Sequence, residues 1–331
     1  MKVAVIGSGG WGTALALCLL RKGHTTVLWS HDAMKAEEVS KTRNNPMLPG
    51  VFLPEELQIT GDDRCVCGCQ LVVFAAPSVH LRGVCRRVAP YLDESAVMVS
   101  VTKGIEPDTF LRMSQIVEEE TGHPVVALTG PSHAEEVAMQ IPTGCLAACA
   151  DQALAEMVQD AFMSESFRIY TSPDIIGAEL GGALKNVIAL CAGTIDGLGY
   201  GDNTLAMLMT RGLTEVARLG MAMGAKKDTF AGLAGIGDLI VTCTSKHSRN
   251  RRAGVLLGQG ISPGEMLKTV GGAVEGYYAA KSVCALAKKM GVEMPIVEAA
   301  YQVLYENVSA ADAVRELLHR ERRPEEDAGW L

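Results

Sequence analysis

Two hydrophobic patterns divide the chain. In the first half, short continuous apolar runs alternate with segments whose apolar residues recur every three to four positions. Continuous runs are typical of strands buried on both faces, and the longer period is typical of helices. The expected strands are Val3–Ile6, Thr25–Trp29, Leu71–Phe74, Val97–Val101, Val125–Leu128 and Gly144–Ala148, and the expected helices are Gly10–Lys22, Val79–Val88, Thr109–Glu120, His133–Met139 and Gln152–Met163. This alternation predicts a parallel, doubly wound sheet covered by helices on both faces.

The pattern changes near Ser172. From Pro173 onward helical periodicity prevails and strand signals almost vanish. The expected helices are Ile175–Gly193, Thr204–Met223, Arg251–Gly258, Ala273–Met290, Pro295–Tyr305 and Ala310–His319. The sequence therefore predicts an α/β domain over residues 1–172 followed by an all-α domain over residues 173–331. The charged tail Arg320–Leu331 contains Pro324 and is expected to fray.

Composition narrows the class of protein. The chain has 331 residues, a length that suits two domains, and it is 48% hydrophobic and 21% charged, as globular proteins are. A formal net charge of −8 argues against nonspecific nucleic-acid binding, so an anion site needs a local basic cluster.

Cysteine usage and the N-terminus bear on the compartment. The run Cys65-Val66-Cys67-Gly68-Cys69 lacks the second half of a zinc site, so we expect reduced thiols and no metal. The start MKVAVIGSGG does not resemble a signal peptide, and no uninterrupted run of about 18 apolar residues predicts a membrane span. We expect a cytoplasmic protein without integral membrane contact.

A glycine-rich turn opens the chain. The strand Val3–Ile6 leads into Gly7-Ser8-Gly9-Gly10-Trp11-Gly12 and then into a helix, which is the GxGxxG pattern in its strand–turn–helix context. Gly7 allows the tight turn, Gly9 lets the backbone approach a pyrophosphate, and Gly12 lets helix and strand pack closely. The pattern predicts a Rossmann-like dinucleotide-binding domain that takes NADH or NADPH.

The residues after the second strand bear on the choice between these two cofactors. An NAD-specific site usually carries a carboxylate there for the ribose 2′-hydroxyl. This chain has Ser30 and His31, with Asp32 just beyond. Without an acid at the tip, a 2′-phosphate is tolerated and NADPH is expected to be accepted. A strand two residues longer would instead bring Asp32 to the tip. For His31, a plain surface position is as good an interpretation as a cofactor contact.

Two lysines occupy positions suited to chemistry. Lys103 follows the strand Val97–Val101, at the sheet edge where doubly wound folds bind ligands. Lys185 lies in the apolar, glycine-rich helical run GGALKNVI, where burial would lower its pKa and suit it to proton transfer. The alternative for each is a snorkelling or surface lysine.

Further polar segments follow the glycine turn along the chain. Gly130-Pro131-Ser132 ends a strand and supplies N–H donors, although it also reads as an ordinary helix cap. The segment AGIGDLIVTCTS contains Asp238, and the run Ser248-Arg249-Asn250-Arg251-Arg252 follows it. An arginine fork and an amide suit a phosphate, although Arg251 and Arg252 also fit a solvated helix face. Glu275 starts a helix and suits either a cofactor hydroxyl or solvent.

Taken in order, these motifs resemble the bacterial-type NAD(P)-dependent glycerol-3-phosphate dehydrogenases. The resemblance runs from Lys2 to about Leu317 and rests on GSGGWGTALA, the loop Arg43–Gly50, TKGIE, GPS, LGGALKNVIA, AGIGDLIVTCTS, SRNRR, VEGYYAAK and MPIVEAAYQVLY. The GDL segment followed by SRNRR is the specific part, because related dehydrogenases share only the first motif and the helical lysine. The loop before Gly50 departs in detail from the family, which leaves its role open.

The resemblance implies reversible reduction of dihydroxyacetone phosphate to sn-glycerol 3-phosphate, which feeds phospholipid synthesis. It makes Lys185 the general acid–base and Lys103 a second catalytic ammonium. The implied cofactor contacts are Gly7, Gly9, Gly10, Trp11, Gly12, His31, Lys103, Ala134, Arg249 and Glu275, and the implied substrate contacts are Lys103, Gly130, Ser132, Lys185, Asp238, Ser248, Arg249 and Asn250. A homodimer is allowed but not determined.

Two other functions stay open from the sequence. A dehydrogenase of the β-hydroxyacid type would account for the glycine turn and Lys185, but not for Asp238 and the Arg249–Asn250 pair. A module that senses NADPH without turnover would need no organised proton donor, whereas two lysines occupy suitable positions.

Overall fold

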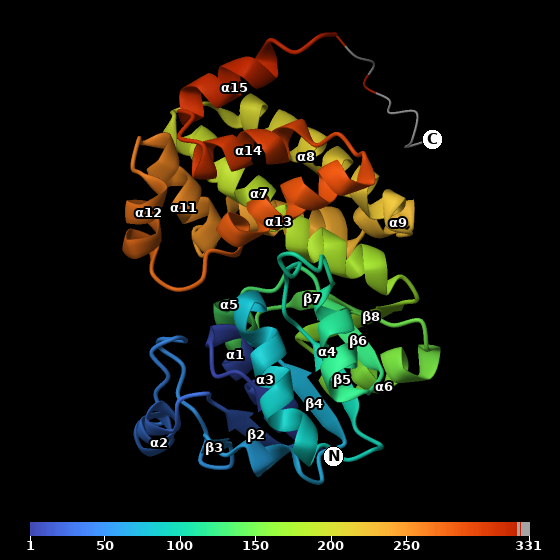
Figure 1. Ribbon diagram of the computed structural model, residues 1–331. Coiled ribbons are helices and arrows are strands. Elements are labelled where there is room, and N and C mark those ends of the chain that lie inside the picture. Colours follow the sequence, from blue (N-terminus) through green and yellow to red (C-terminus); the bar gives the residue numbers. More distant parts are fainter. Residues whose placement is uncertain (323–324, 326–331) are drawn as a thin grey trace. The chain divides into compact units, whose positions relative to one another are not determined.

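The computed structural model describes residues 1–322 and residue 325 (Figure 1). The chain forms two compact units. The first comprises Met1–Lys103 and Leu111–Ile175, and the second comprises Gly104–Phe110 and the chain from Ile176. The short excursion Gly104–Phe110 joins the second unit because Ile105 and Phe110 pack into its helical core. Most of the tail expected to fray lies outside the described residues.

The first unit is built on an eight-stranded sheet. Its strands are β1 (Lys2–Ile6), β2 (Thr25–Trp29), β3 (Gln58–Thr60), β4 (Leu71–Phe74), β5 (Val97–Ser100), β6 (Val125–Thr129), β7 (Thr143–Ala148) and β8 (Phe167–Ser172). They lie in the order β3-β2-β1-β4-β5-β6-β7-β8, and every pair is parallel except β6–β7. The predicted Rossmann-like, doubly wound sheet is confirmed, and it is parallel in all but one pair.

The antiparallel pair corrects the expectation of a wholly parallel sheet. The connection from β6 to β7 contains only the five-residue helix α5 (Ala134–Ala138). A parallel crossover must carry the chain back along a whole strand length, which usually takes a dozen or more residues with a longer helix. The chain therefore enters β7 from the end at which β6 finishes.

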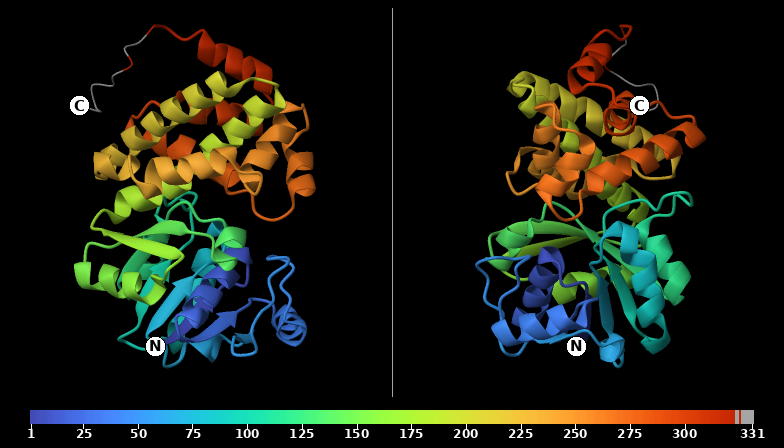
Figure 2. Two further views of the ribbon diagram at one scale, coloured as in Figure 1. Left: turned by 180° about the vertical axis from the view of Figure 1, so that it is seen from behind. Right: turned by 60° about the vertical axis from the view of Figure 1, so that its left-hand side comes forward.

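Helices cover both faces of this sheet (Figures 1 and 2). Alternate residues of β1 face opposite sides: Val3 and Val5 pack with α1 (Gly10–Arg21) and α6 (Gln152–Phe162), whereas Ala4 and Ile6 pack with α3 (Leu81–Val88) and α4 (Met113–Thr121). Such two-sided burial is why the strands are continuous apolar runs. The helix α2 (Ala33–Thr42) follows β2.

The second unit consists of helices in the residues that the structure describes, as predicted. They are α7 (Ile175–Gly197), α8 (Asp202–Ala222), α9 (Lys227–Phe230), α10 (Asp238–Thr244), α11 (Arg249–Gly258), α12 (Pro263–Val270), α13 (Glu275–Met290), α14 (Pro295–Tyr305) and α15 (Ala310–Leu318). By length and composition α7 is apolar enough to cross a membrane, but 83% of its most apolar window is buried inside the protein. That burial is typical of the core helix of a soluble protein.

Glycines let α7 and α11 cross in close contact. A Cβ on Gly193 would lie 1.9 Å from the carbonyl oxygen of Arg251, and one on Gly254 would lie 1.9 Å from that of Leu190. Any side chain at these positions would force the helices apart. The crossing places the start of α11 beside the middle of α7, where Lys185 lies.

Candidate active site

The glycine turn of the first unit has the predicted geometry. Gly7 has φ of 130°, a value that favours glycine, and a Cβ on Gly12 would lie 1.9 Å from the Gly7 carbonyl oxygen. Gly9 is the N-cap of α1 and makes no side-chain cap, and α1 has no acidic residue in its first turn. Backbone N–H groups at such a helix start favour an anion. The residues therefore fit the pyrophosphate of a dinucleotide.

Neighbouring residues border this turn. Ala134, the first residue of α5, lies 3.7 Å from the position of a Cβ on Gly10, and Trp11 is half-buried against the adjoining core. Trp11 and Ala134, two of the expected cofactor contacts in this unit, thus lie at the glycine turn.

The end of β2 shows which of Ser30, His31 and Asp32 lies at the strand tip and which of them are exposed. The strand ends at Trp29, and the Asp32 carboxylate accepts the backbone N–H groups of Met34 and Lys35, so it caps α2. Ser30, the first residue after the strand, is 1% exposed, and its hydroxyl lacks a hydrogen-bond partner in the described part of the chain, so its side chain is not placed to bind a 2′-phosphate. His31 is exposed at this tip, as is the helix-capping Asp32.

Three predicted residues meet where β5 and β6 end. Lys103 Nζ donates to the Gly130 carbonyl oxygen at 3.2 Å, and Ser132 Oγ donates to the same oxygen at 3.0 Å. Gly130 has φ of 146°, and a Cβ there would lie 3.0 Å from the Cys145 Cα. At this edge of the sheet, the Lys103 ammonium group and the Ser132 hydroxyl therefore share one acceptor, the Gly130 carbonyl oxygen.

Lys185 lies in the middle of α7 and is 6% exposed. Its ammonium group pairs with the Asp238 carboxylate and donates to Thr242 Oγ1 at 2.5 Å. Thr242 Oγ1 in turn donates to the Asp238 carbonyl oxygen at 2.6 Å, one turn earlier in α10. The surroundings of Lys185 are therefore less apolar than the sequence suggests, because a carboxylate that is 1% exposed compensates its charge.

A second polar cluster joins three helices beside Lys185. Asn250 Nδ2 donates to Asn186 Oδ1 at 2.9 Å, and the Gly276 N–H donates to Asn250 Oδ1 at 2.8 Å. Asn186 immediately follows Lys185, and Gly276 immediately follows Glu275, the first residue of α13. The amide of Asn250 thereby fixes Asn186 of α7 and Gly276 of α13 relative to α11.

The start of α11 presents an arginine to solvent. Ser248 is the N-cap and accepts the Arg251 N–H at 3.2 Å. Arg249 is exposed and lies beside Gly272, where a Cβ would be 2.7 Å from Nη1. Arg251 is half-buried and pairs with Asp196 at 2.6 Å, so the solvated-face alternative does not describe it. The Arg249 guanidinium is thus accessible to an anion.

Sequence reasoning missed three polar residues of this arrangement. Thr242 and Asn186 complete the Lys185 and Asn250 clusters, and Asn45 bonds to the glycine turn. For Thr242 the usable signal is its spacing of four from Asp238, which puts both on one helix face. For Asn186 the signal is only its adjacency to Lys185.

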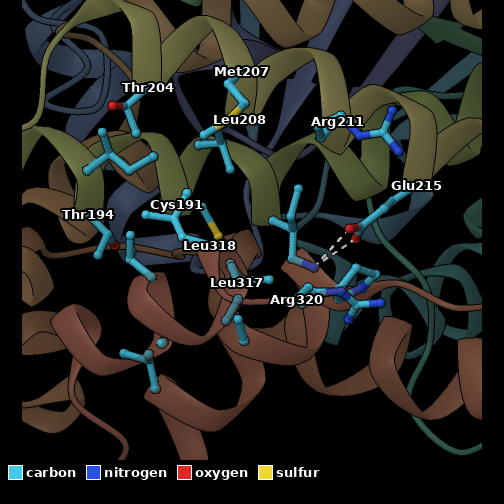
Figure 3. Close-up of a pocket in the computed structure, with 18 of the residues that line it drawn as sticks. Cys191, Thr194, Thr204, Met207, Leu208, Arg211, Glu215, Leu317, Leu318 and Arg320 are labelled. Carbon is cyan, nitrogen blue, oxygen red and sulfur yellow. Dashed lines mark hydrogen bonds between the residues drawn. The ribbon is translucent and has the colours of Figure 1, made fainter. Parts of the chain in front are cut away.

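The second unit also contains a separate cavity of about 750 Å³ between α7, α8, α14 and α15 (Figure 3). Its lining is mainly apolar and includes none of the predicted site residues. Glu215, 3% exposed, lines it and accepts the backbone N–H groups of Ile296 and Val297 at 2.9 to 3.3 Å. Burial raises the pKa of this carboxyl to about 7.

Comparison with known proteins agrees with this geometry. The family model described as NAD-dependent glycerol-3-phosphate dehydrogenase N-terminus matches residues 2–155, and the corresponding C-terminus model matches residues 174–315.

Individual relatives match over nearly their whole length. The glycerol-3-phosphate dehydrogenase (NAD(P)+) of Pelotomaculum thermopropionicum is 52% identical, with 96% of this chain and 93% of that protein covered. The protein of that name from Fusobacterium nucleatum is 50% identical, with 98% of each covered. The crystal structure of glycerol-3-phosphate dehydrogenase from Coxiella burnetii superposes with a TM-score of 0.93 at 38% identity, covering 96% and 99%. The resemblance inferred from the motifs is confirmed, and the chain belongs to the NAD-dependent glycerol-3-phosphate dehydrogenase family.

Proposed function

We propose that the chain catalyses the reversible, NAD(P)H-dependent reduction of dihydroxyacetone phosphate to sn-glycerol 3-phosphate, the backbone of phospholipids. The observation that carries the proposal is the buried Lys185 ammonium, held by Asp238 and Thr242 in the unit that also presents Arg249. A buried proton donor and an accessible phosphate-binding cation are what reduction of a phosphorylated ketone requires.

Lys185 performs the proton transfer. When bound, a nicotinamide would supply a hydride to C2 of the ketone, and negative charge would then develop on the carbonyl oxygen. Lys185 stabilises that oxygen as it forms and donates one proton from Nζ, which gives the alcohol and leaves a neutral amine. In the reverse direction the amine takes this proton back. Asp238 and Thr242 hold Nζ in one position throughout, so little reorganisation accompanies the transfer.

Arg249 binds the phosphate of the substrate through charged hydrogen bonds. Asn250 and Ser248 border the same helix start, and the cap of α11 by Ser248 fixes where Arg249 leaves the helix. The family resemblance makes Lys103, Gly130 and Ser132 further substrate contacts, with Lys103 as the second catalytic ammonium; Lys103 Nζ and Ser132 Oγ both donate to the Gly130 carbonyl oxygen. Holding the phosphate orients C2 and turns a bimolecular encounter into a positioned reaction.

The glycines Gly7, Gly9, Gly10 and Gly12 hold the dinucleotide pyrophosphate. The other cofactor contacts are Trp11, His31, Lys103, Ala134, Arg249 and Glu275. His31 follows β2, and the acidic residue beside it, Asp32, is engaged in capping α2. This supports use of NADPH as well as NADH. No metal enters the proposed chemistry.

We also propose that the protein is cytoplasmic and binds neither nucleic acid nor membrane. All ten cysteines are free thiols, which suits a reducing compartment, and the net charge of −8 disfavours polyanions. Light scattering after size exclusion determines the oligomeric state: a homodimer, which the sequence allows, would have twice the chain mass.

A substrate panel tests the function against its alternatives. Oxidation of NADPH on addition of dihydroxyacetone phosphate supports the proposal. Oxidation only with 3-oxo acids or semialdehyde acids would support a dehydrogenase of the β-hydroxyacid type. Binding of NADPH without turnover on any member would support a sensing module.

A further inference from the structure

A buried amide connects a loop to the glycine turn. Asn45 belongs to the loop between α2 and β3, and it is fully buried. Its Nδ2 donates to the Ser8 carbonyl oxygen at 2.9 Å and to Thr13 Oγ1 at 2.7 Å, while its Oδ1 accepts the Met47 N–H at 3.0 Å. The amide thus joins the middle of the turn, the first turn of α1 and its own loop.

The bond to Ser8 fixes the orientation of one peptide group. The peptide bond between Ser8 and Gly9 is trans, so its C=O and N–H point in opposite directions. Because the Ser8 carbonyl points at the Asn45 amide, the Gly9 N–H points away from Asn45. Gly9 is the N-cap of α1, no heavy atom lies within 4 Å of the position its Cβ would occupy, and its N–H has no acceptor among the described residues.

The loop that carries Asn45 is itself held firmly. Leu48 and Leu53 are fully buried, and Arg43 Nη1 donates to the carbonyl oxygens of Pro54 and Leu57 at 3.2 and 2.8 Å. The Met47 carbonyl oxygen lies 2.6 Å from where a Cβ on Gly10 would be. The loop backbone therefore packs against the helix start, and Asn45 is anchored from the loop side as well.

We infer that Asn45 is a positioning residue for the cofactor: by holding the Ser8 carbonyl it directs the Gly9 N–H toward the pyrophosphate of NAD(P)H. This inference rests on the dinucleotide site of the proposed function. It predicts that loss of the amide donors weakens dinucleotide binding while leaving the proton-transfer machinery around Lys185 intact.

Asn44 provides a matched control. It is the same residue type one position earlier and it is exposed; only its backbone N–H and C=O bond to Thr42 Oγ1, and its side chain makes no hydrogen bond among the described residues. Asn45→Asp replaces both donors with an oxygen that repels the Ser8 carbonyl. Asn44→Asp introduces the same charge in the same loop, so it reports simple repulsion between a new carboxylate and an anionic cofactor.

The test is the equilibrium Kd for NADPH, from tryptophan fluorescence or calorimetry, at a temperature well below the Tm of each variant. We expect Asn45→Asp to raise this Kd at least tenfold relative to Asn44→Asp, with kcat at saturating NADPH and KM for dihydroxyacetone phosphate within about twofold. If Asn45→Asp fails to fold, Asn45→Ala with Asn44→Ala as its control carries the same expectation.

Two outcomes would overturn the inference. One is an NADPH Kd for folded Asn45 variants within twofold of the Asn44 controls. The other concerns Thr13→Val, a variant that keeps the bond between Asn45 and the Ser8 carbonyl. If it loses as much NADPH affinity as Asn45→Ala, the loss comes from the packing of α1 and not from the Ser8 peptide. Wild-type protein that binds no NADPH in the same titration would overturn the proposed function itself.

Discussion

Replacing Lys185 by methionine tests the buried pair as well as the chemistry. Methionine matches the lysine stem in length, so the sequence alone suggests a structurally neutral change. The structure indicates otherwise, because Asp238 is 1% exposed and would keep a carboxylate without its cation. Leaving one partner of a buried pair uncompensated costs about 3–5 kcal/mol of the free energy of unfolding. For a unit of this size the Tm falls by roughly 6–20 °C.

The double variant Lys185→Met/Asp238→Asn separates stability from catalysis. Removing the orphaned charge restores most of the free energy of unfolding, whereas activity stays lost because no proton donor remains. The expected loss in kcat is about 100-fold or more in both variants. Asp238→Asn alone removes the carboxylate that compensates the Lys185 ammonium, so the double-mutant cycle is expected to show a coupling of about 2–3 kcal/mol.

Urea unfolding followed by circular dichroism gives the free energies, and NADPH absorbance gives the rates. NADPH affinity of the folded single and double variants should stay near that of the wild type. The reasoning fails if Lys185→Met is as stable as the wild type, since the pair would then carry no charge compensation. It fails equally if the double variant recovers most of its kcat, since Lys185 would then not be the proton donor.

Four further outcomes are expected. Arg249→Ala raises the KM for dihydroxyacetone phosphate roughly 10- to 100-fold, from about 1.5–3 kcal/mol per charged hydrogen bond, and leaves the poor activity on unphosphorylated dihydroxyacetone unchanged; equal losses on both would assign Arg249 elsewhere. The Glu215 carboxyl has a pKa raised from 4.5 to about 7, so its contribution to stability is complete below pH 4.5 and is lost as pH rises through 7. Wild-type stability should therefore fall by up to about 3 kcal/mol between pH 5 and 8, and urea titrations of Glu215→Gln should show a flatter pH profile. His31→Asp should raise the KM for NADPH at least tenfold and spare NADH, and an equal effect on both cofactors would remove His31 from the 2′ position. Gly12→Ala should abolish dinucleotide binding or folding, because its Cβ would lie 1.9 Å from the Gly7 carbonyl oxygen; calorimetry showing wild-type affinity would contradict that contact.

Continuous apolar runs made several strands predictable. The strands β2 and β4 have the predicted bounds: β4 is apolar throughout, and β2 consists of β-branched threonines followed by a buried apolar run. The strand β8 was missed because Arg168 and Tyr170 alternate with buried Phe167 and Ile169, so no continuous run exists.

Local backbone conformation explains other differences. The helix α4 begins at Met113 rather than Thr109, because Asp108 and Phe110 have positive φ values that a helix does not contain. The helix α10 was missed because glycines dominate the segment before it. Gly235 is needed there, since a Cβ would lie 2.0 Å from the Phe230 carbonyl oxygen.

Within the candidate site, single residues with a strong chemical identity were predictable and their partners were not. Lys185 and Asp238 are recognisable in their motifs. The role of Thr242 depends on the helix α10, which the sequence pattern did not predict. The partners of Asn45 lie 37 and 32 residues earlier in the chain, a separation that no local pattern encodes. Burial of Ser30 likewise depends on side-chain packing at the end of β2.

Transfer of deuterium from labelled nicotinamide to product tests the central claim most directly. The enzyme is incubated with dihydroxyacetone phosphate and NADPH that carries deuterium at C4, and the product is analysed by mass spectrometry and by an assay specific for sn-glycerol 3-phosphate. The account predicts one sn-glycerol 3-phosphate per NADPH oxidised, with deuterium at C2. Oxidation of NADPH without this product, or product without the label at C2, would contradict it.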